Sequence, residues 1–350
     1  MKTGALSSKN DTFSLEKWNS YYSKLYLPNT VLLTIWLIIG TLGNATVIFV
    51  YQKGLKNKGH GRFFIPILAT VDLMCVSVSA TFNIVQITGR VTFPDSWICK
   101  MFFYSIRVIL THSMLIMTVI AISRFQHICH IIKYQIKTFH LWIAIAGTGI
   151  FSMLSYIPTF FAFGTVEVYK ENITGYKCKE IDNDAIALDK GSLYFMAVVH
   201  GTSILLIIIS YFSIAVFIFK AYCRRRRHTM NINTIESENG GNGLTMRSGP
   251  KNKQMKTPLW SYRFTLMFFT LQVCMLVGYI PHVIAIKKEE ADPNFWDRKS
   301  DDISKNVHLA MRLLYFTNAV INPFLYGFFD PAFRRKLVYL ICNRKRTGFA

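Results

Sequence analysis

Long apolar stretches without charged residues dominate the pattern of hydrophobic and polar positions along the chain. No Asp, Glu, Lys or Arg occurs between residues 24 and 53, between 137 and 167, or between 190 and 220. Each stretch is longer than the roughly 20 residues that cross a bilayer as an α-helix. Helices of soluble domains carry polar residues on one face. We therefore predict membrane-spanning helices.

The length criterion predicts an all-α membrane protein, a seven-transmembrane helix bundle. The segments cover approximately residues 27–52, 63–89, 97–130, 139–163, 192–222, 258–286 and 304–328. This divides the chain into an N-terminal tail (1–26), the bundle (27–328) with a flexible third inner loop (224–257), and a C-terminal tail (329–350).

Composition and charge agree with this prediction. The chain is 51% hydrophobic and only 17% charged, whereas about a quarter of the residues in soluble domains are charged. A soluble enzyme, a nucleic-acid-binding protein and a disordered protein are thereby excluded. Away from the ends of the spans, charges occur at Asp72, Arg107, Arg124 and Arg312. Because each costs about 2.5–3.5 kcal/mol near a bilayer centre, we expect each to have a function.

The net charge of +21 indicates the orientation. With the N-terminus outside, nearly all the excess positive charge falls in cytoplasmic segments, as the positive-inside rule requires. An odd number of spans then places the C-terminus in the cytoplasm. The basic excess therefore indicates contact with anionic membrane lipids and not with nucleic acid.

Two kinds of residue on the predicted outer side support this orientation. Asn10 and Asn172 begin glycosylation sequons, and both fall outside the membrane. Of the seven cysteines, only Cys99 and Cys178 lie on the oxidising side. We therefore expect one disulfide, which ties the start of the third span to the second outer loop.

A series of different short motifs follows along the chain, most of them one to a span. They are Gly43-Asn44, Leu68-Ala69-Thr70-Val71-Asp72, Cys99, Ala121-Ile122-Ser123-Arg124-Phe125, Trp142, Pro281, Asn322-Pro323-Phe324-Leu325-Tyr326 and Phe333-Arg334-Arg335. In this order the chain resembles a rhodopsin-like (class A) G-protein-coupled receptor of the peptide-receptor type. The resemblance implies a plasma-membrane receptor, not an enzyme, that activates a heterotrimeric G protein and also binds arrestin. It implies a short amphipathic helix along the inner membrane face.

Three positions depart from the family pattern. Ser123 replaces the acid that usually pairs with the neighbouring arginine, Tyr279 replaces a tryptophan, and Ser203 stands where a proline is usual. The loss of the acid leads to the hypothesis of raised ligand-independent signalling, and simple tolerance of the serine is the alternative. Tyr279 is either part of the switch or an ordinary packed aromatic residue.

The resemblance also assigns switch, ion and lipid sites. The expected switch and coupling residues are Arg124, Tyr211, Tyr279, Pro281, Asn322, Pro323 and Tyr326. The expected ligands of an allosteric sodium ion are Asp72, Ser113, Asn318 and Asn322. The alternative for Asp72 is a structural hydrogen bond, and Ala319 replaces a hydroxyl that usually lies nearby. Cys342, after an amphipathic run, is a predicted palmitoylation site.

The outer half of the bundle suggests an anionic ligand. Ile106 stands where amine receptors carry an aspartate, and Phe316 stands where opsins carry the retinal lysine. Arg107 and Arg312 cannot lose their protons, and no acid is predicted in the outer halves of the helices. We therefore expect a ligand with an anionic group. The alternative is that both arginines reach acids of the outer loops, namely Glu167, Glu289 or Glu290. The predicted ligand-binding residues are Arg107, Arg312, His282, His200, Ile106, Phe195 and Tyr315.

The class of ligand stays open between two candidates. Long outer loops with charges of both signs favour a peptide, and an aromatic-rich cavity also suits a lipid carboxylate. A transporter, channel or membrane enzyme would need several carboxylates or a metal cluster within the membrane, and only Asp72 is present. A ligand-binding receptor with weak or no G-protein coupling remains a further alternative because of Ser123.

Overall fold

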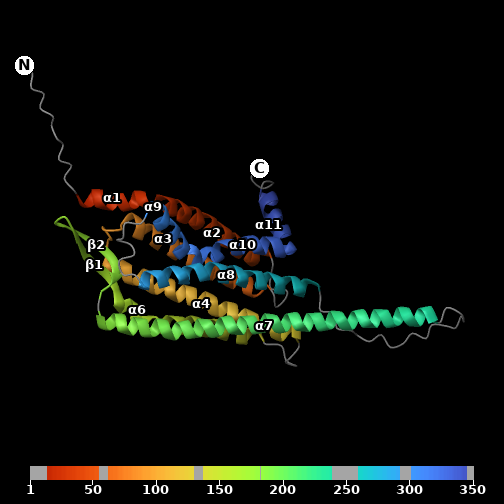
Figure 1. Ribbon diagram of the computed structural model, residues 1–350. Helices are drawn as coiled ribbons and strands as arrows, with labels where there is room; N and C mark the ends of the chain where they lie inside the picture. The colour runs from red at the N-terminus through yellow and green to blue at the C-terminus, as the bar shows by residue number, and fades with distance from the viewer. Residues whose placement is uncertain are drawn as a thin grey trace, which may run out of the picture.

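The computed structural model is a bundle of long helices lying side by side, with a β-hairpin at one end and a short helix turned away at the other (Figure 1). We call these ends the hairpin end and the α11 end. The structure describes residues 14–54, 62–129, 137–181, 183–238, 259–291 and 301–344. Asn10 and residues 239–257 of the predicted third inner loop lie outside the described residues.

The elements follow one another in a simple order. They are α1 (Leu15–Leu25), α2 (Leu27–Gly54), α3 (Phe64–Thr88), α4 (Ser96–Cys129), α5 (Thr138–Ser155), α6 (Ile157–Ala162), β1 (Phe163–Lys170), β2 (Ile173–Glu180), α7 (Asn183–Glu238), α8 (Leu259–Ala291), α9 (Asp302–Leu313), the 3-10 helix η1 (Leu314–Phe316), α10 (Thr317–Phe329) and α11 (Pro331–Arg344).

The prediction of a seven-helix bundle is confirmed, although the seventh span differs from the others. Among the described residues, six helical segments are long and apolar enough to cross a membrane, and the seventh crossing consists of α9, η1 and α10 in succession. None of these three pieces reaches 18 residues, because η1 interrupts the α-helical hydrogen bonding. The short helix α11 follows, as expected.

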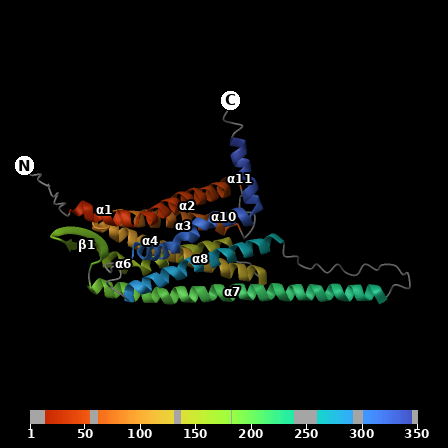
Figure 2. The same cartoon turned by 45° about the horizontal axis from the view of Figure 1, so that its top comes forward.

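The helix α7 is longer than the predicted fifth span, 192–222, at both ends. The structure begins α7 at residue 183 and not at 192, and the helix continues to Glu238, into the region predicted as a flexible loop. No Gly or Pro occurs between residues 202 and 239, so nothing in the local sequence ends the helix where its apolar stretch ends. In both views α7 extends beyond the rest of the bundle at the α11 end (Figure 2).

The predicted N-terminal tail contains a helix. Ser14 caps α1 by accepting a hydrogen bond from the Lys17 amide at 3.2 Å, and Trp18 is buried. The Asn19 side chain donates to the Thr88 carbonyl at 2.6 Å and accepts from the Val91 amide at 3.1 Å. These contacts fasten α1 to the hairpin-end terminus of α3.

The core and the outer faces of the helices differ as expected for a membrane protein. Large apolar side chains from α3, α4, α8 and α10 are fully buried at the centre, among them Leu68, Ile116 and Phe268. Large apolar side chains are also exposed on the outer faces, including Phe212 at 71% and Trp142 at 52%. Such extensive exposed apolar surface suits a lipid environment.

The hairpin closes one end of the bundle. Strands β1 and β2 are antiparallel, and Thr165 pairs with Cys178. Cys178 forms a disulfide with Cys99 at the start of α4, so the predicted disulfide is confirmed. Asn172 lies exposed in the hairpin turn with φ 64°, a left-handed conformation that asparagine tolerates. Its glycosylation stays a prediction.

A close backbone contact joins α8 to the seventh span. A Cβ atom at Gly278 would lie 2.6 Å from the carbonyl oxygen of Leu314. Only glycine therefore lets α8 approach η1 this closely. Gly278 immediately precedes Tyr279, so this contact fixes the place of a predicted switch residue.

Candidate functional site

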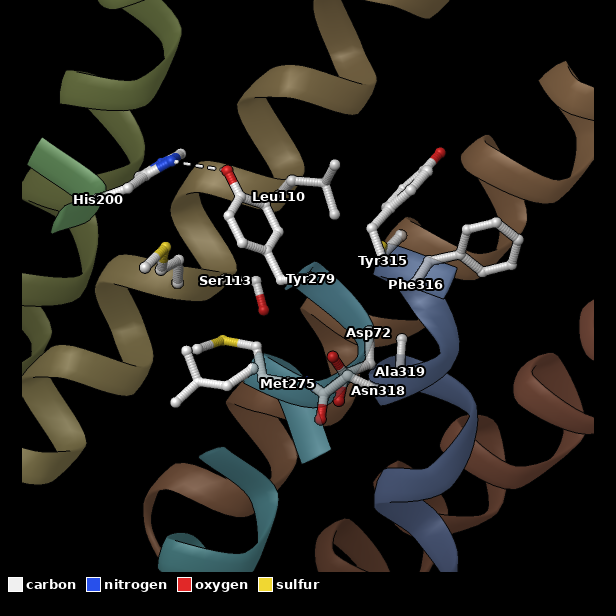
Figure 3. A pocket seen from close by; sticks show the side chains of 13 residues that line it. Asp72, Leu110, Ser113, His200, Met275, Tyr279, Tyr315, Phe316, Asn318 and Ala319 are labelled. Atoms are coloured by element: carbon white, nitrogen blue, oxygen red, sulfur yellow. Dashed lines mark hydrogen bonds between the residues drawn. The ribbon is translucent and has the colours of Figure 1, made fainter. Parts of the chain in front are cut away.

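A cavity lies in the middle of the bundle, between α3, α4, α7, α8 and the seventh span (Figure 3). Its lining residues are Asp72, Cys75, Leu110, Ser113, Met114, His200, Met275, Leu276, Tyr279, Tyr315, Phe316, Asn318 and Ala319. The volume open to the centres of water molecules is about 50 Å³, and one ordered water needs roughly 10–15 Å³. The cavity therefore has room for an ion with a few waters, and not for a peptide.

Polar side chains link one wall of the cavity to the switch position on α8. The Tyr279 hydroxyl lies 3.5 Å from His200 Nδ1 (Figure 3), and His200 Nε2 lies 3.1 Å from the Thr111 hydroxyl. Thr111 in turn lies 3.0 Å from the Tyr156 hydroxyl. This network joins α4, the junction of α5 and α6, α7 and α8. Tyr279 is therefore part of a hydrogen-bonded network, and its role in the switch stays a prediction.

The opposite wall carries the predicted ion site. Asp72 is 1% exposed and accepts a hydrogen bond from Asn322 Nδ2 at 2.6 Å. The Oδ1 atoms of Asn318 and Asn322 are buried and have no hydrogen-bond partner among the residues that the structure describes. Ser113 also lines the cavity, and Figure 3 shows its hydroxyl in the same space as the oxygens of Asp72 and Asn318. One carboxylate with unsatisfied neutral oxygens suits a hard monovalent cation.

Arg107 was predicted to have no acid nearby, and this premise is wrong. Its Nη1 atom donates to both carboxylate oxygens of Asp189, at 2.6 and 2.8 Å, and to the Thr159 hydroxyl at 2.7 Å. Thr159 donates to Asp189 as well, at 2.7 Å. Asp189 is 1% exposed. Asp189 was not among the predicted site residues, because α7 begins before the apolar stretch from which the fifth span was predicted.

Arg312 is also paired. Its Nη1 atom lies 2.6 Å from Glu289 Oε2, which is one of the loop acids named as the alternative partner. His308 Nε2 lies 3.0 Å from the other oxygen of Glu289. Nδ1 of His282 donates to the carbonyl oxygen of Arg312 at 2.6 Å. Glu289 belongs to α8 because this helix extends past the predicted end of the sixth span.

The remaining predicted ligand-binding residues lie in different surroundings. His200 and Tyr315 line the central cavity, and the Tyr315 ring lies 4.7 Å from that of His282. Ile106 packs into the apolar cluster around the disulfide. Phe195 is 54% exposed and lies beside Phe151 of α5, with ring centres 6.2 Å apart. The structure therefore does not bring Phe195 and Ile106 into the central cavity.

Three of the predicted coupling residues, Arg124, Tyr211 and Tyr326, are buried. Arg124 is 1% exposed, and its guanidinium lies 4.9 Å from the centre of the Phe268 ring on α8. Tyr211 and Tyr326 are 8% and 0% exposed, and neither hydroxyl has a hydrogen-bond partner. Pro281 and Pro323 lie inside α8 and α10. Each removes one backbone hydrogen bond from its helix.

A polar cluster that the sequence analysis missed lies at the junction of α10 and α11. Asp330 is fully buried and accepts hydrogen bonds from Tyr51 at 2.8 Å and from Nε and Nη2 of Arg62 at 3.1 Å. Burial alone would raise the pKa of Asp330, but these hydrogen bonds and the Arg62 charge lower it below its usual value. The cluster therefore persists at neutral pH and is lost only when the pH falls through that lowered pKa.

The surface of α11 agrees with a position along a membrane. Val338, Tyr339, Ile341 and Cys342 are exposed. Palmitoylation of Cys342 stays a prediction.

Comparisons with known proteins place the chain among membrane receptors. The sequence model of the family described as 7 transmembrane receptor (rhodopsin family) matches residues 43–326. The type-1 angiotensin II receptor B of Xenopus laevis is 23% identical over 344 residues, which cover 95% of this chain and 86% of that receptor. Proteinase-activated receptor 2 of Bos taurus is 22% identical over 343 residues, covering 96% and 77% of the two chains.

Two further comparisons bear on ligand class and fold. The octopamine receptor beta-2R of Drosophila melanogaster is 24% identical over 340 residues, which cover 88% of this chain and 60% of that receptor. Squid rhodopsin has a similar structure, with a TM-score of 0.64, 17% identity, and coverage of 92% of this chain and 85% of that one.

Proposed function

This chain belongs to the rhodopsin family of seven-transmembrane receptors, and we propose that it carries an extracellular peptide signal to a heterotrimeric G protein at the plasma membrane. Members of this family are signalling receptors rather than enzymes. In the orientation we propose, the hairpin end is extracellular and the α11 end is cytoplasmic, because the basic excess then lies inside.

The burial of Arg124 is the observation that carries the proposed activation mechanism. At 1% exposure under the Phe268 ring, Arg124 is out of reach of any protein that approaches the α11 end. A G protein, and arrestin after it, contact Arg124 only after the cytoplasmic half of α8 moves outward. Pro281 weakens the hydrogen-bond ladder of α8 and supplies the bend for this motion.

The ligand binds above the central cavity, which is too small for a peptide. The hairpin carries exposed charged side chains at this end of the bundle. Two of the relatives are named as angiotensin II and proteinase-activated receptors. An anionic group of the ligand contacts Arg107 or Arg312 by replacing the carboxylate of Asp189 or Glu289. Ligand binding changes the position of Tyr279 through the hydrogen-bonded network that contains His200.

Two alternatives remain for this function. A lipid carboxylate satisfies the same arginines and suits the aromatic side chains near them, such as Phe163, whose ring centre lies 5.1 Å from the Arg107 guanidinium. A receptor with weak or no G-protein coupling is the second, and the specific observation behind it is Ser123 next to Arg124.

A ligand screen with a coupling readout tests this function. Secreted peptides and lipid carboxylates are applied to cells that express the chain, with reporters for several G-protein classes. We expect a peptide to activate one reporter in the wild type. The Arg124→Leu variant should bind it without activation, and the Arg107→Ala and Arg312→Ala variants should lose on the order of tenfold in potency each. Ligand binding without nucleotide exchange in the wild type would contradict the proposed coupling. Unchanged potency in both alanine variants would contradict the anionic group.

We also propose that the cavity binds a sodium ion. The Asp72 carboxylate and the unsatisfied oxygens of Asn318 and Asn322 fit such an ion, with Ser113 beside them. Among the described residues no group of three or more His, Cys, Asp or Glu could hold a metal ion. This agrees with a weakly held monovalent cation.

Sodium should stabilise the receptor through Asp72. In sodium chloride the purified wild type should melt roughly 2–4 °C higher than in choline chloride of the same concentration, which corresponds to about 1.4 kcal/mol at ten times the dissociation constant. The Asp72→Asn variant should show no difference between the two salts. A sodium effect that persists in this variant would place the ion elsewhere.

A further inference from the structure

Three buried residues of α8 lie four positions apart on one helix face. Phe264, Phe268 and Gln272 are 5%, 0% and 2% exposed. Residues at this spacing share one face of an α-helix. We call these three residues the latch stripe. The stripe lies in the half of α8 nearest the α11 end, which is the half that moves in the proposed mechanism.

Each member of the latch stripe contacts a different group. The Phe268 ring centre lies 4.9 Å from the Arg124 guanidinium, and the Phe264 ring centre lies 5.6 Å from that of Arg62. Gln272 Nε2 donates to the carbonyl oxygen of Met117 on α4 at 3.0 Å. Two cation–π contacts and one hydrogen bond therefore join α8 to its neighbours.

The two arginines are held in place by other elements. Arg62 is held by Asp330, which also accepts a hydrogen bond from Tyr51. The contact between Phe264 and Arg62 therefore connects α8 to the junction of α10 and α11. Arg124 belongs to α4, the helix that also supplies the Met117 carbonyl. A cation over an aromatic face is worth most where both are desolvated, as Arg124 and Phe268 are at 1% and 0% exposure.

The sequence of α8 excludes the alternative of a charged lock on this helix. No Asp or Glu occurs in α8 before Glu289, which lies at the hairpin end. A carboxylate from the moving half of α8 therefore cannot pair with Arg124. The polar contacts that this half of α8 makes to α4 therefore come from Phe268 and Gln272, beside the apolar packing of the core.

We propose that the latch stripe holds the cytoplasmic half of α8 against α4 in the resting receptor, in place of an arginine–carboxylate pair. The inference deepens the proposed function, because it rests on Arg124 being the group that α8 uncovers. It leads to low ligand-independent signalling, the opposite of the expectation drawn from Ser123 alone. The Oε1 atom of Gln272 is buried without a hydrogen-bond partner among the described residues. This lowers the stability of the resting state, so that the contact can be broken on activation.

The distance between α8 and α5 reports the state of the latch without any G protein or ligand. Spin labels are placed on genetically encoded ketone residues at Arg263 and His140, both exposed, which leaves the five free cysteines unlabelled. Phe268→Leu and Gln272→Met should each raise the population with a longer distance by roughly tenfold. The matched control Phe219→Leu, at an exposed position on α7, should leave the distances unchanged.

A fluorinated series separates the cation–π contact from simple packing. Mono-, di- and trifluorophenylalanine at position 268 keep the shape of the ring, so the receptor folds, and progressively weaken its attraction for a cation. The population with the longer distance should rise step by step with fluorination, together with the basal rate of nucleotide exchange.

The outcomes are distinguishable. Distances that stay at the wild-type values in Phe268→Leu and Gln272→Met would overturn the latch. A flat response across the fluorinated series would overturn its cation–π basis. A longer distance without faster nucleotide exchange, across a panel of G proteins, would support the latch and contradict the coupling assigned to Arg124.

Discussion

Replacing Asp189 with alanine is expected to lower the free energy of unfolding by on the order of 3–5 kcal/mol. Arg107 keeps its charge at any accessible pH, and the substitution removes the carboxylate that accepts two of its hydrogen bonds, at 2.6 and 2.8 Å. The Thr159 hydroxyl loses its acceptor at the same time. In the purified receptor the melting temperature should fall by roughly 5–10 °C.

A double substitution tests whether the loss comes from the uncompensated charge. In Arg107→Met combined with Asp189→Leu no charge is left without a partner, so most of the lost stability should return. Glu180→Ala, at an exposed site in β2, is the matched control and should melt like the wild type. If the double variant melts as low as Asp189→Ala, the pair contributes through packing and not through charge.

Replacing Cys99 with serine is expected to lower the stability of the receptor by a similarly large amount. The disulfide to Cys178 closes a loop with a sequence separation of 79. In the chain-entropy account a loop of this length contributes on the order of 4 kcal/mol. The substitution also frees β2 from the start of α4, so the hairpin loses its position over the bundle. We expect little receptor at the cell surface, measured with an N-terminal tag.

The free cysteines provide the control for this experiment. Cys342→Ser changes an exposed thiol on α11 and should leave surface expression at the wild-type level. Cys178→Ser should reproduce the defect of Cys99→Ser, and combining the two should add nothing further. Normal surface expression of either single variant would show that the hairpin is held by its other contacts.

Most of the fold could be predicted because a long apolar stretch without charges has few stable structures open to it besides a membrane-spanning helix. In the part of the chain that the structure describes, six segments are long and apolar enough to span a membrane, although some contain isolated charges such as Asp72 and Arg107. The seventh crossing was found by its apolar content, but the interruption at residues 314–316 depends on the contact with Gly278, which is a tertiary feature. The helical extension of α7 could not be predicted from hydrophobicity, since propensity and not polarity decides where that helix ends.

The candidate site was predictable only in part, for a related reason. The resemblance to rhodopsin-like receptors implies that Asn322 lies near Asp72, and in the structure Asn322 Nδ2 lies 2.6 Å from Asp72 Oδ2. Asp189 is 82 positions from its partner Arg107, and no local pattern indicates such a pair. Gln272 was not among the predicted residues, because its contact depends on a carbonyl of another helix.

The contact at Gly278 bears on how a signal crosses the receptor. Side chains usually absorb small displacements between helices by changing rotamer. Where α8 meets the carbonyl of Leu314 there is no side chain on the α8 side to do so. We therefore expect a tilt of the seventh helix to displace the α8 backbone next to Tyr279 directly, with little loss in side-chain rearrangement.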